Sequence, residues 1–178
     1  MRIVAGSRKG HRIDAPKGVV TRPTGDRVRE AVFSIVGSVE GATVLDLFAG
    51  SGAMGLEALS RGAAEAVFVE RDGRACRVIE QNVEKLGLTD KATVVLRDAA
   101  RALRDATARG ARYDLVLVDA PYDQWSRVEP QLSELLPAVA SDGGLVVVET
   151  AAGVEPILPL DLVTTRRYGS ARITVFSR

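Results

Sequence analysis

Near residue 46 an apolar run stops at an acid and is followed at once by a cluster of glycines. The run covers residues 44–47 and includes Asp46, and a stretch with the composition of a helix, 56–61, ends at Gly62. Between them lie Gly50, Gly52 and Gly55. A strand, a tight glycine loop and a helix in this order are typical of the opening of a nucleotide-binding α/β unit.

The spacing of these glycines is compatible with two kinds of cofactor. The pattern G-x-G-x-x-G, with an acid about 20 residues further on, is the dinucleotide fingerprint, and Glu70 stands at that place. Asp46 separates the two possibilities, because a carboxylate at the mouth of the loop would repel a pyrophosphate but tolerates an amino group and a sulfonium. We therefore expect S-adenosylmethionine. An NAD enzyme, and a plain loop or cap role for Asp46, remain open.

Short apolar runs alternate with helical stretches through the middle of the chain. Two final runs, 162–168 and 172–176, are separated by only three residues, which leaves no room for a crossover helix and predicts an antiparallel hairpin. The pattern predicts an α/β fold whose sheet has five parallel strands followed by that hairpin. The parallel strands are expected at 43–47, 66–69, 93–96, 114–118 and 145–149.

The first 30 residues carry a charge of +5, so the remainder of the chain carries −4. Runs at 2–4 and 11–13 predict a small β-ribbon, which we treat as a basic extension over residues 1–20 preceding the main domain, 21–178. A basic arm on a mildly acidic body indicates a polyanionic partner, with a solvated basic tail as the alternative. A helix is expected over 26–36, with arginines that point away from its apolar stripe. These arginines are Arg27 and Arg29.

The composition is that of one globular domain: 178 residues, of which 46% are hydrophobic. No apolar run approaches the length of a membrane span, and residues 1–4 lead into charges rather than into a signal-peptide core, so we expect a cytoplasmic protein. With one cysteine, Cys76, and one histidine, His11, neither an internal disulfide nor a Cys/His metal site is expected. The helical spacing around Cys76 favours a core residue.

Acids follow each of the first four expected strands. They are Asp46, Glu70, Asp98 and Asp119. The carboxyl ends of parallel strands meet at one edge of an open α/β sheet, where ligands bind. Glu70 is placed to accept hydrogen bonds from ribose hydroxyls, and Asp98 can accept one from an adenine amino group beside the small Ala99. A helix N-cap is the alternative role for Asp98.

The segment 119–122 resembles the (Asp/Asn)-Pro-Pro-(Tyr/Phe) motif of methyltransferases that act on exocyclic amino groups of nucleic-acid bases. Such an amine is a poor nucleophile, and a carboxylate and a main-chain carbonyl that accept its two N–H groups can aim its lone pair at a methyl donor. Tyr122 would stack on a flipped base, and the transfer needs alignment rather than a metal. Ala120 stands where proline is usual, so a rigid turn residue is lost although the carbonyl survives. A simple turn with a buried tyrosine is the alternative.

Three segments, 21–33, 46–52 and 119–122, together resemble the RsmD family, whose members methylate N2 of a guanine in bacterial small-subunit ribosomal RNA. The resemblance covers essentially the whole chain, and 22–30 is its most specific part. It implies action on this RNA or on the assembled small subunit, and a monomer is the default expectation. It implies catalytic roles for Asp119, Ala120, Pro121 and Tyr122. It implies that S-adenosylmethionine is bound by Asp46, Phe48, Ala49, Gly50, Gly52, Glu70, Arg71, Asp98, Ala99 and Asp119. It implies RNA contacts by Arg8, Lys9, His11, Arg12, Arg22, Thr24, Arg27 and Arg29.

Two further alternatives share parts of this interpretation. An adenine-N6 methyltransferase acting on DNA would use the same cofactor site and tetrapeptide, although the chain has no room for a separate DNA-recognition domain. A non-catalytic RNA-binding or assembly protein could keep the fold with a relaxed site at Ala120.

Overall fold

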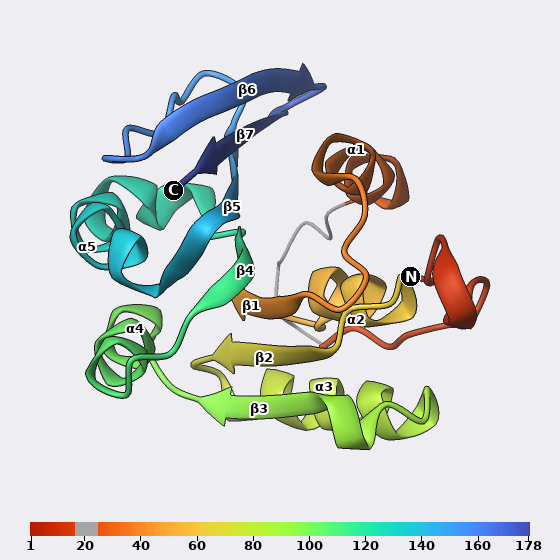
Figure 1. Cartoon of the computed structure of the whole chain (residues 1–178). Coiled ribbons are helices and arrows are strands. Elements are labelled where there is room, and N and C mark those ends of the chain that lie inside the picture. Colours follow the sequence, from red (N-terminus) through yellow and green to blue (C-terminus); the bar gives the residue numbers. More distant parts are fainter. Residues whose placement is uncertain (17–24) are drawn as a thin grey trace.

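The structure, a computed structural model, describes residues 1–16 and 25–178. The expected boundary between extension and main domain at residue 20, and the RNA contacts expected of Arg22 and Thr24, lie outside the described residues. The centre of the molecule is a seven-stranded sheet with strand order β3-β2-β1-β4-β5-β7-β6 (Figure 1). The strands are β1 (Thr43–Leu47), β2 (Glu65–Glu70), β3 (Ala92–Leu96), β4 (Tyr113–Val118), β5 (Ala140–Ala151), β6 (Asp161–Tyr168) and β7 (Ala171–Ser177).

Strands β1 to β5 are parallel, and β7 pairs antiparallel with both β5 and β6. The predicted sheet of five parallel strands and a C-terminal hairpin is therefore confirmed. The chain runs outward from β1 through β2 to β3 and then returns to place β4 on the other side of β1. Strand order reverses between β1 and β4, and in open α/β sheets ligands bind at the carboxyl ends of the strands beside such a reversal.

Helices cover both faces of the sheet (Figure 1). Helices α1, α2 and α3 pack on one face, and α4 and α5 on the other. Their bounds are α1 (Asp26–Val36), α2 (Ala53–Ser60), α3 (Gly73–Lys85), α4 (Ala99–Ala108) and α5 (Trp125–Val139). Short 3₁₀ helices are η1 (Gly6–Arg8), η2 (Thr89–Lys91) and η3 (Tyr122–Gln124). Of the described helices, none has the length and apolar character needed to cross a membrane.

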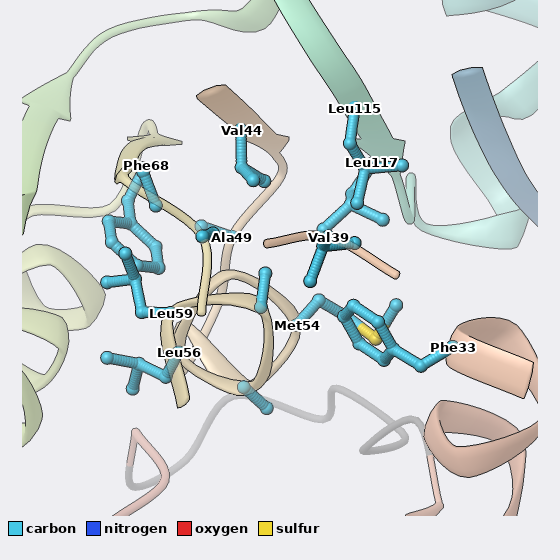
Figure 2. Packing of buried hydrophobic residues seen from close by; sticks show 14 of the residues in the cluster. Phe33, Val39, Val44, Ala49, Met54, Leu56, Leu59, Phe68, Leu115 and Leu117 are labelled. Carbon is cyan, nitrogen blue, oxygen red and sulfur yellow. The ribbon is translucent and has the colours of Figure 1, made fainter. Parts of the chain in front are cut away.

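Apolar side chains at helical spacing account for the attachment of these helices. On α3, Ala75, Cys76, Ile79 and Val83 are buried, which confirms Cys76 as a core residue. In the core on this face, Phe33 of α1 and Met54 of α2 belong to one buried cluster (Figure 2), and the guanidinium of Arg61, the residue that follows α2, lies 4.7 Å from the centre of the Phe33 ring. Helix α1 is thereby fixed beside α2, the helix that follows the glycine loop.

The N-terminal residues 1–16 pack against this same layer as an extra segment, with Ile3 and Ile13 buried in its core. The expected β-ribbon is reduced to one isolated antiparallel bridge, between Arg2 and Arg12. It is shorter than predicted because backbone N–H groups at positions 4, 5 and 8 donate to side chains of α2 instead of to a second strand. The segment is thus held both by helix side chains and by backbone hydrogen bonds between its own two runs, such as those from Ile3 N–H to His11 (3.0 Å) and from Ile13 N–H to Met1 (3.1 Å).

Candidate active site at the carboxyl edge of the sheet

The glycine loop turns sharply between β1 and α2. Phe48, Gly50 and Gly52 have φ angles of 62°, 56° and 78°, in the left-handed region that glycine adopts without strain. Gly55 has a different role, because a Cβ there would lie 2.4 Å from a ring carbon of Phe68. The first two glycines therefore make the turn, and the third lets α2 pack closely on β2.

Asp46 lies beneath this loop and is 2% exposed. Its Oδ2 accepts a hydrogen bond of 2.9 Å from the Gly55 N–H in the first turn of α2. Burial raises the pKa of Asp46 from 3.8 to about 7, against the lowering effect of that hydrogen bond, and the negative charge of Glu70 raises it further. The carboxyl group therefore anchors the first turn of α2, and it does not line the pocket.

A pocket of about 180 Å³ lies over the carboxyl ends of β1 to β4. Several residues predicted to bind the cofactor line it: Phe48, Gly50, Glu70, Arg71, Asp98, Ala99 and Asp119. Three others, Asp46, Ala49 and Gly52, are buried behind the loop surface. The pocket wall also includes Pro16, Val69, Asp72, Ala75, Arg97 and Pro121.

Two carboxylates of the pocket are held by backbone N–H groups. Glu70 accepts hydrogen bonds from Gly50 through Oε2 (2.9 Å) and from the two residues that follow it through Oε1 (2.7 and 2.9 Å). Asp98 Oδ1 accepts from the N–H groups of Ala100 (3.1 Å) and Arg101 (3.2 Å) and so caps α4. Asp98 is both the N-cap considered above and an exposed acceptor in the pocket wall.

Asp119 follows β4 and stands between this pocket and a hollow of about 10 Å³ on the other side. The hollow lies between the sheet and the helices that carry Val32 and Met54, and Glu149 near the end of β5 also lines it. Tyr122, at the start of η3, donates its hydroxyl proton to Glu149 Oε1 over 3.0 Å. Tyr122 is 37% exposed, so the alternative of a buried tyrosine is excluded.

Ala120 is 1% exposed, and Pro121 lines the pocket beside Asp119. The alanine side chain is therefore packed in the core at the position where proline is usual.

Sequence reasoning missed two features of this site. Glu149 is an acid at the carboxyl end of a fifth strand, so the pattern that singled out the other four acids could have included it. Pro16 reaches the pocket from the N-terminal segment, which no local pattern reveals.

The residues predicted to contact RNA are in different environments. Lys9, His11, Arg12 and Arg27 are exposed. Arg8 is partly buried, and its Nε donates to the Leu86 carbonyl over 2.6 Å. The described part of the predicted RNA face is therefore concentrated near residues 9–12 and at Arg27.

The expectation that Arg29 points to solvent is wrong, because its side chain is completely buried. Its Nη2 donates to the Arg2 carbonyl (2.6 Å) and pairs with Asp26 (2.9 Å), and its Nε lies 3.4 Å from Glu57 Oε2. The physical reason is Glu57, a carboxylate of α2 that is also 0% exposed and requires a buried cation. Arg29 holds α1 and the N-terminal segment onto α2, and it has no surface to offer RNA.

The chain resembles known proteins over its whole length. A family model described as "Conserved hypothetical protein 95" matches residues 1–177. YlbH of Bacillus subtilis (strain 168), whose name proposes an rRNA methyltransferase, is 38% identical over 187 residues, 100% of this chain and 99% of YlbH. Ribosomal RNA small subunit methyltransferase D of Escherichia coli (strain K12) is 39% identical over 123 residues, which cover 68% of this chain and 60% of that protein.

Solved structures that resemble this chain indicate the same class of protein. The Escherichia coli protein yhhF, named provisionally as a methyltransferase, superposes with a TM-score of 0.84 at 32% identity, covering 100% of this chain and 97% of that one. An RNA methyltransferase from Salinibacter ruber, solved with S-adenosyl-L-homocysteine, has a TM-score of 0.67 over 87% of this chain and 92% of its own, and at 18% identity it shows a shared fold. The chain therefore belongs to the RsmD family and has the Rossmann-like fold of class I S-adenosylmethionine-dependent methyltransferases.

Proposed function

We propose that this protein transfers a methyl group from S-adenosylmethionine to the exocyclic N2 amine of a guanine in small-subunit ribosomal RNA. The position of Asp119, between the larger pocket and the hollow at Glu149, is the observation that carries the proposal. The name of the Escherichia coli relative supports the choice of RNA. We expect a monomer that acts in the cytoplasm on this RNA, free or assembled into the subunit.

The polar groups of the pocket suit S-adenosylmethionine better than a dinucleotide. A pyrophosphate needs free N–H groups and positive potential at the start of the helix after the glycine loop. Here the Gly55 N–H is already bound by the buried carboxyl group of Asp46. Glu70 and Asp98 would accept hydrogen bonds from the ribose and adenine of the cofactor, which supplies a methyl group already activated on a sulfonium.

Asp119 and the main-chain carbonyl of Ala120 would hold the target amine. Each accepts one N–H, which directs the nitrogen lone pair toward the pocket, and the proton shed after transfer passes to the Asp119 carboxylate. The hollow beside Asp119 is too small for a base, so the base must be held at its mouth. Tyr122 is exposed there and can stack on a base extruded from the RNA.

Glu149 favours guanine over adenine as the target. Guanine presents an N1–H beside its N2 amine, whereas adenine presents a bare N1 acceptor beside its N6 amine. A second carboxylate at the same site as Asp119 suits two neighbouring donors and would repel the adenine N1 lone pair. Because Glu149 also accepts the Tyr122 hydroxyl, one residue contributes both to base selection and to the position of the stacking ring.

Methyl transfer from labelled S-adenosylmethionine to small ribosomal subunits that lack the modification tests this proposal, with digestion of the RNA to nucleosides. We expect labelled N2-methylguanosine, and loss of at least about a hundredfold in rate for Asp119→Asn with RNA binding retained. Asp123→Asn, an exposed acid of η3 four residues further along the chain, is the matched control. Labelled N6-methyladenosine would overturn the guanine assignment, and absence of label with every substrate form would favour a non-catalytic assembly protein.

A further inference from the structure

Asn82 of α3 joins two distant segments through a completely buried side chain. Its Oδ1 accepts a hydrogen bond from the Asp14 N–H (2.8 Å), and its Nδ2 donates to the Asp14 carbonyl (3.0 Å) and to the Ser51 carbonyl (3.1 Å). Asp14 belongs to the N-terminal segment and Ser51 to the glycine loop. One amide therefore fixes the register of the segment against the loop that shapes the pocket.

The N-terminal segment reaches the pocket directly after this contact. Pro16, two residues beyond Asp14, is buried and forms part of the pocket wall. At its other end the segment is fixed by Glu57, which accepts hydrogen bonds from the N–H groups of Val4 (2.8 Å) and Ala5 (2.9 Å). The exposed residues 9–12 lie between the two attachments.

If Asn82 only stabilised the fold, hydrogen bonds from its amide to any buried polar groups would be enough. All three of its partner groups instead belong to segments 31 and 68 residues away in sequence, and both segments adjoin the pocket. A buried amide that loses a partner is costly, so the two segments are held together rather than merely placed near one another. A displacement of one segment must therefore strain the other.

We propose that Asn82 is a positioning residue that couples the RNA-binding face of the N-terminal segment to the cofactor pocket. When RNA holds residues 9–12, the segment keeps Pro16 and Ser51 in the arrangement that binds cofactor, and bound cofactor in turn favours the docked segment. Linkage requires the two effects to be equal in size. This inference rests on the proposed function, because it takes RNA and S-adenosylmethionine as the two ligands.

The first test is calorimetric binding of S-adenosylhomocysteine to the full chain. Asn82→Ala should weaken binding about tenfold, since two segments of the pocket lose a common support. Gln81→Ala, an exposed neighbour on the same helix, should bind as the wild type does. Asn82→Ser keeps a small polar side chain at the buried position but cannot reach both segments, and it should also weaken binding, so it decides the matter if Asn82→Ala does not fold.

The second test repeats these titrations with a small-subunit ribosomal RNA transcript present. In the wild type the RNA should tighten S-adenosylhomocysteine binding severalfold, and in Asn82→Ala the ratio of affinities with and without RNA should fall to about one. A merely structural role would leave this ratio unchanged, and that result would overturn the inference, as would wild-type affinity in both variants. Failure of the wild type to bind S-adenosylhomocysteine at all would instead overturn the proposed function.

Discussion

The two helical layers of the molecule are held to the same sheet by different interactions. The layer of α1, α2 and α3 contains four buried polar or charged side chains, namely Arg29, Glu57, Ser60 and Asn82. Within residues 1–16 and 25–178, α4 and α5 contribute no charged or amide side chain to the buried set. Their contact with the sheet is made mostly by alanines and leucines, together with Trp125 and Val139 of α5.

This difference matches what each layer has to hold. The N-terminal segment offers few apolar side chains, so backbone groups at positions 4, 5, 8 and 14 are bound by Glu57, Ser60 and Asn82. Hydrogen bonds have a fixed geometry, whereas apolar contacts tolerate sliding and repacking. The layer of α1, α2 and α3, called here the polar layer, therefore specifies where the N-terminal segment lies relative to the pocket. The layer of α4 and α5, the apolar layer, contributes stability without positioning a site.

The largest expected effect is that of Glu57→Ala. It leaves the buried Arg29 paired only with the partly exposed Asp26 and removes the acceptor for Val4 and Ala5, so it should cost about 3–5 kcal/mol of unfolding free energy. Urea unfolding measures the cost, and trypsin cleavage after Lys9 and Arg12, at temperatures where the variant is folded, measures release of the segment. The double variant with Arg29→Met should recover part of the loss. A cost below about 1 kcal/mol would show that the polar groups do not hold this layer.

A core substitution in the apolar layer should have a similar cost but no effect on the segment. Leu136 of α5 is 0% exposed, and Leu136→Ala should destabilise the fold by about 2–5 kcal/mol through reduced burial and the cavity left behind. Trypsin resistance of residues 1–16 and S-adenosylhomocysteine affinity should match the wild type under conditions where the variant is folded. Release of the segment in this variant would remove the distinction between the two layers.

The sequence predicts both layers about equally well where periodicity determines the structure. The helix expected over 26–36 is observed at Asp26–Val36, and the expected strand 43–47 is observed at Thr43–Leu47. Apolar spacing reports which face of an element is buried, and glycine reports where it ends. These signals are local, so they are equally strong on both sides of the sheet.

Periodicity does not predict the polar contacts. Arg29 is predicted to face solvent because its helix has an apolar stripe elsewhere, and only the three-dimensional position of Glu57 explains its burial. The same limit applies to the acids at the strand ends. Their common edge follows from topology, but the difference between the buried Asp46 and the pocket-lining Glu70 depends on which side of the loop each faces.

Asp46 of β1, whose carboxyl group is bound by the first turn of α2, gives the polar-layer side of the sheet a pH dependence near neutral pH. Its pKa is about 7 in the folded chain and about 3.9 for an unfolded aspartate, so the folded state binds more protons between these values. The free energy of unfolding should therefore fall as pH rises through this window, by roughly 2.5 kcal/mol from pH 5 to pH 8. Asp46→Asn keeps an acceptor for the Gly55 N–H and should remove this part of the slope in urea titrations at the two pH values. An unchanged slope would assign the pH dependence to other groups.

The smallest expected effect concerns the one polar group that the apolar layer does bury. Trp125, at the start of α5, is 4% exposed, and its Nε1 has no hydrogen-bond partner among the described residues. Trp125→Phe removes an unsatisfied hydrogen-bond donor, which stabilises the fold, but the smaller ring packs less well, which destabilises it. Because the two effects oppose each other, the free energy of unfolding should change by no more than about 1 kcal/mol. Urea unfolding followed by circular dichroism measures it, because the variant has no tryptophan to report by fluorescence. A destabilisation of about 3 kcal/mol or more would mean that this indole makes a structural hydrogen bond, and that the apolar layer also depends on a directed polar interaction.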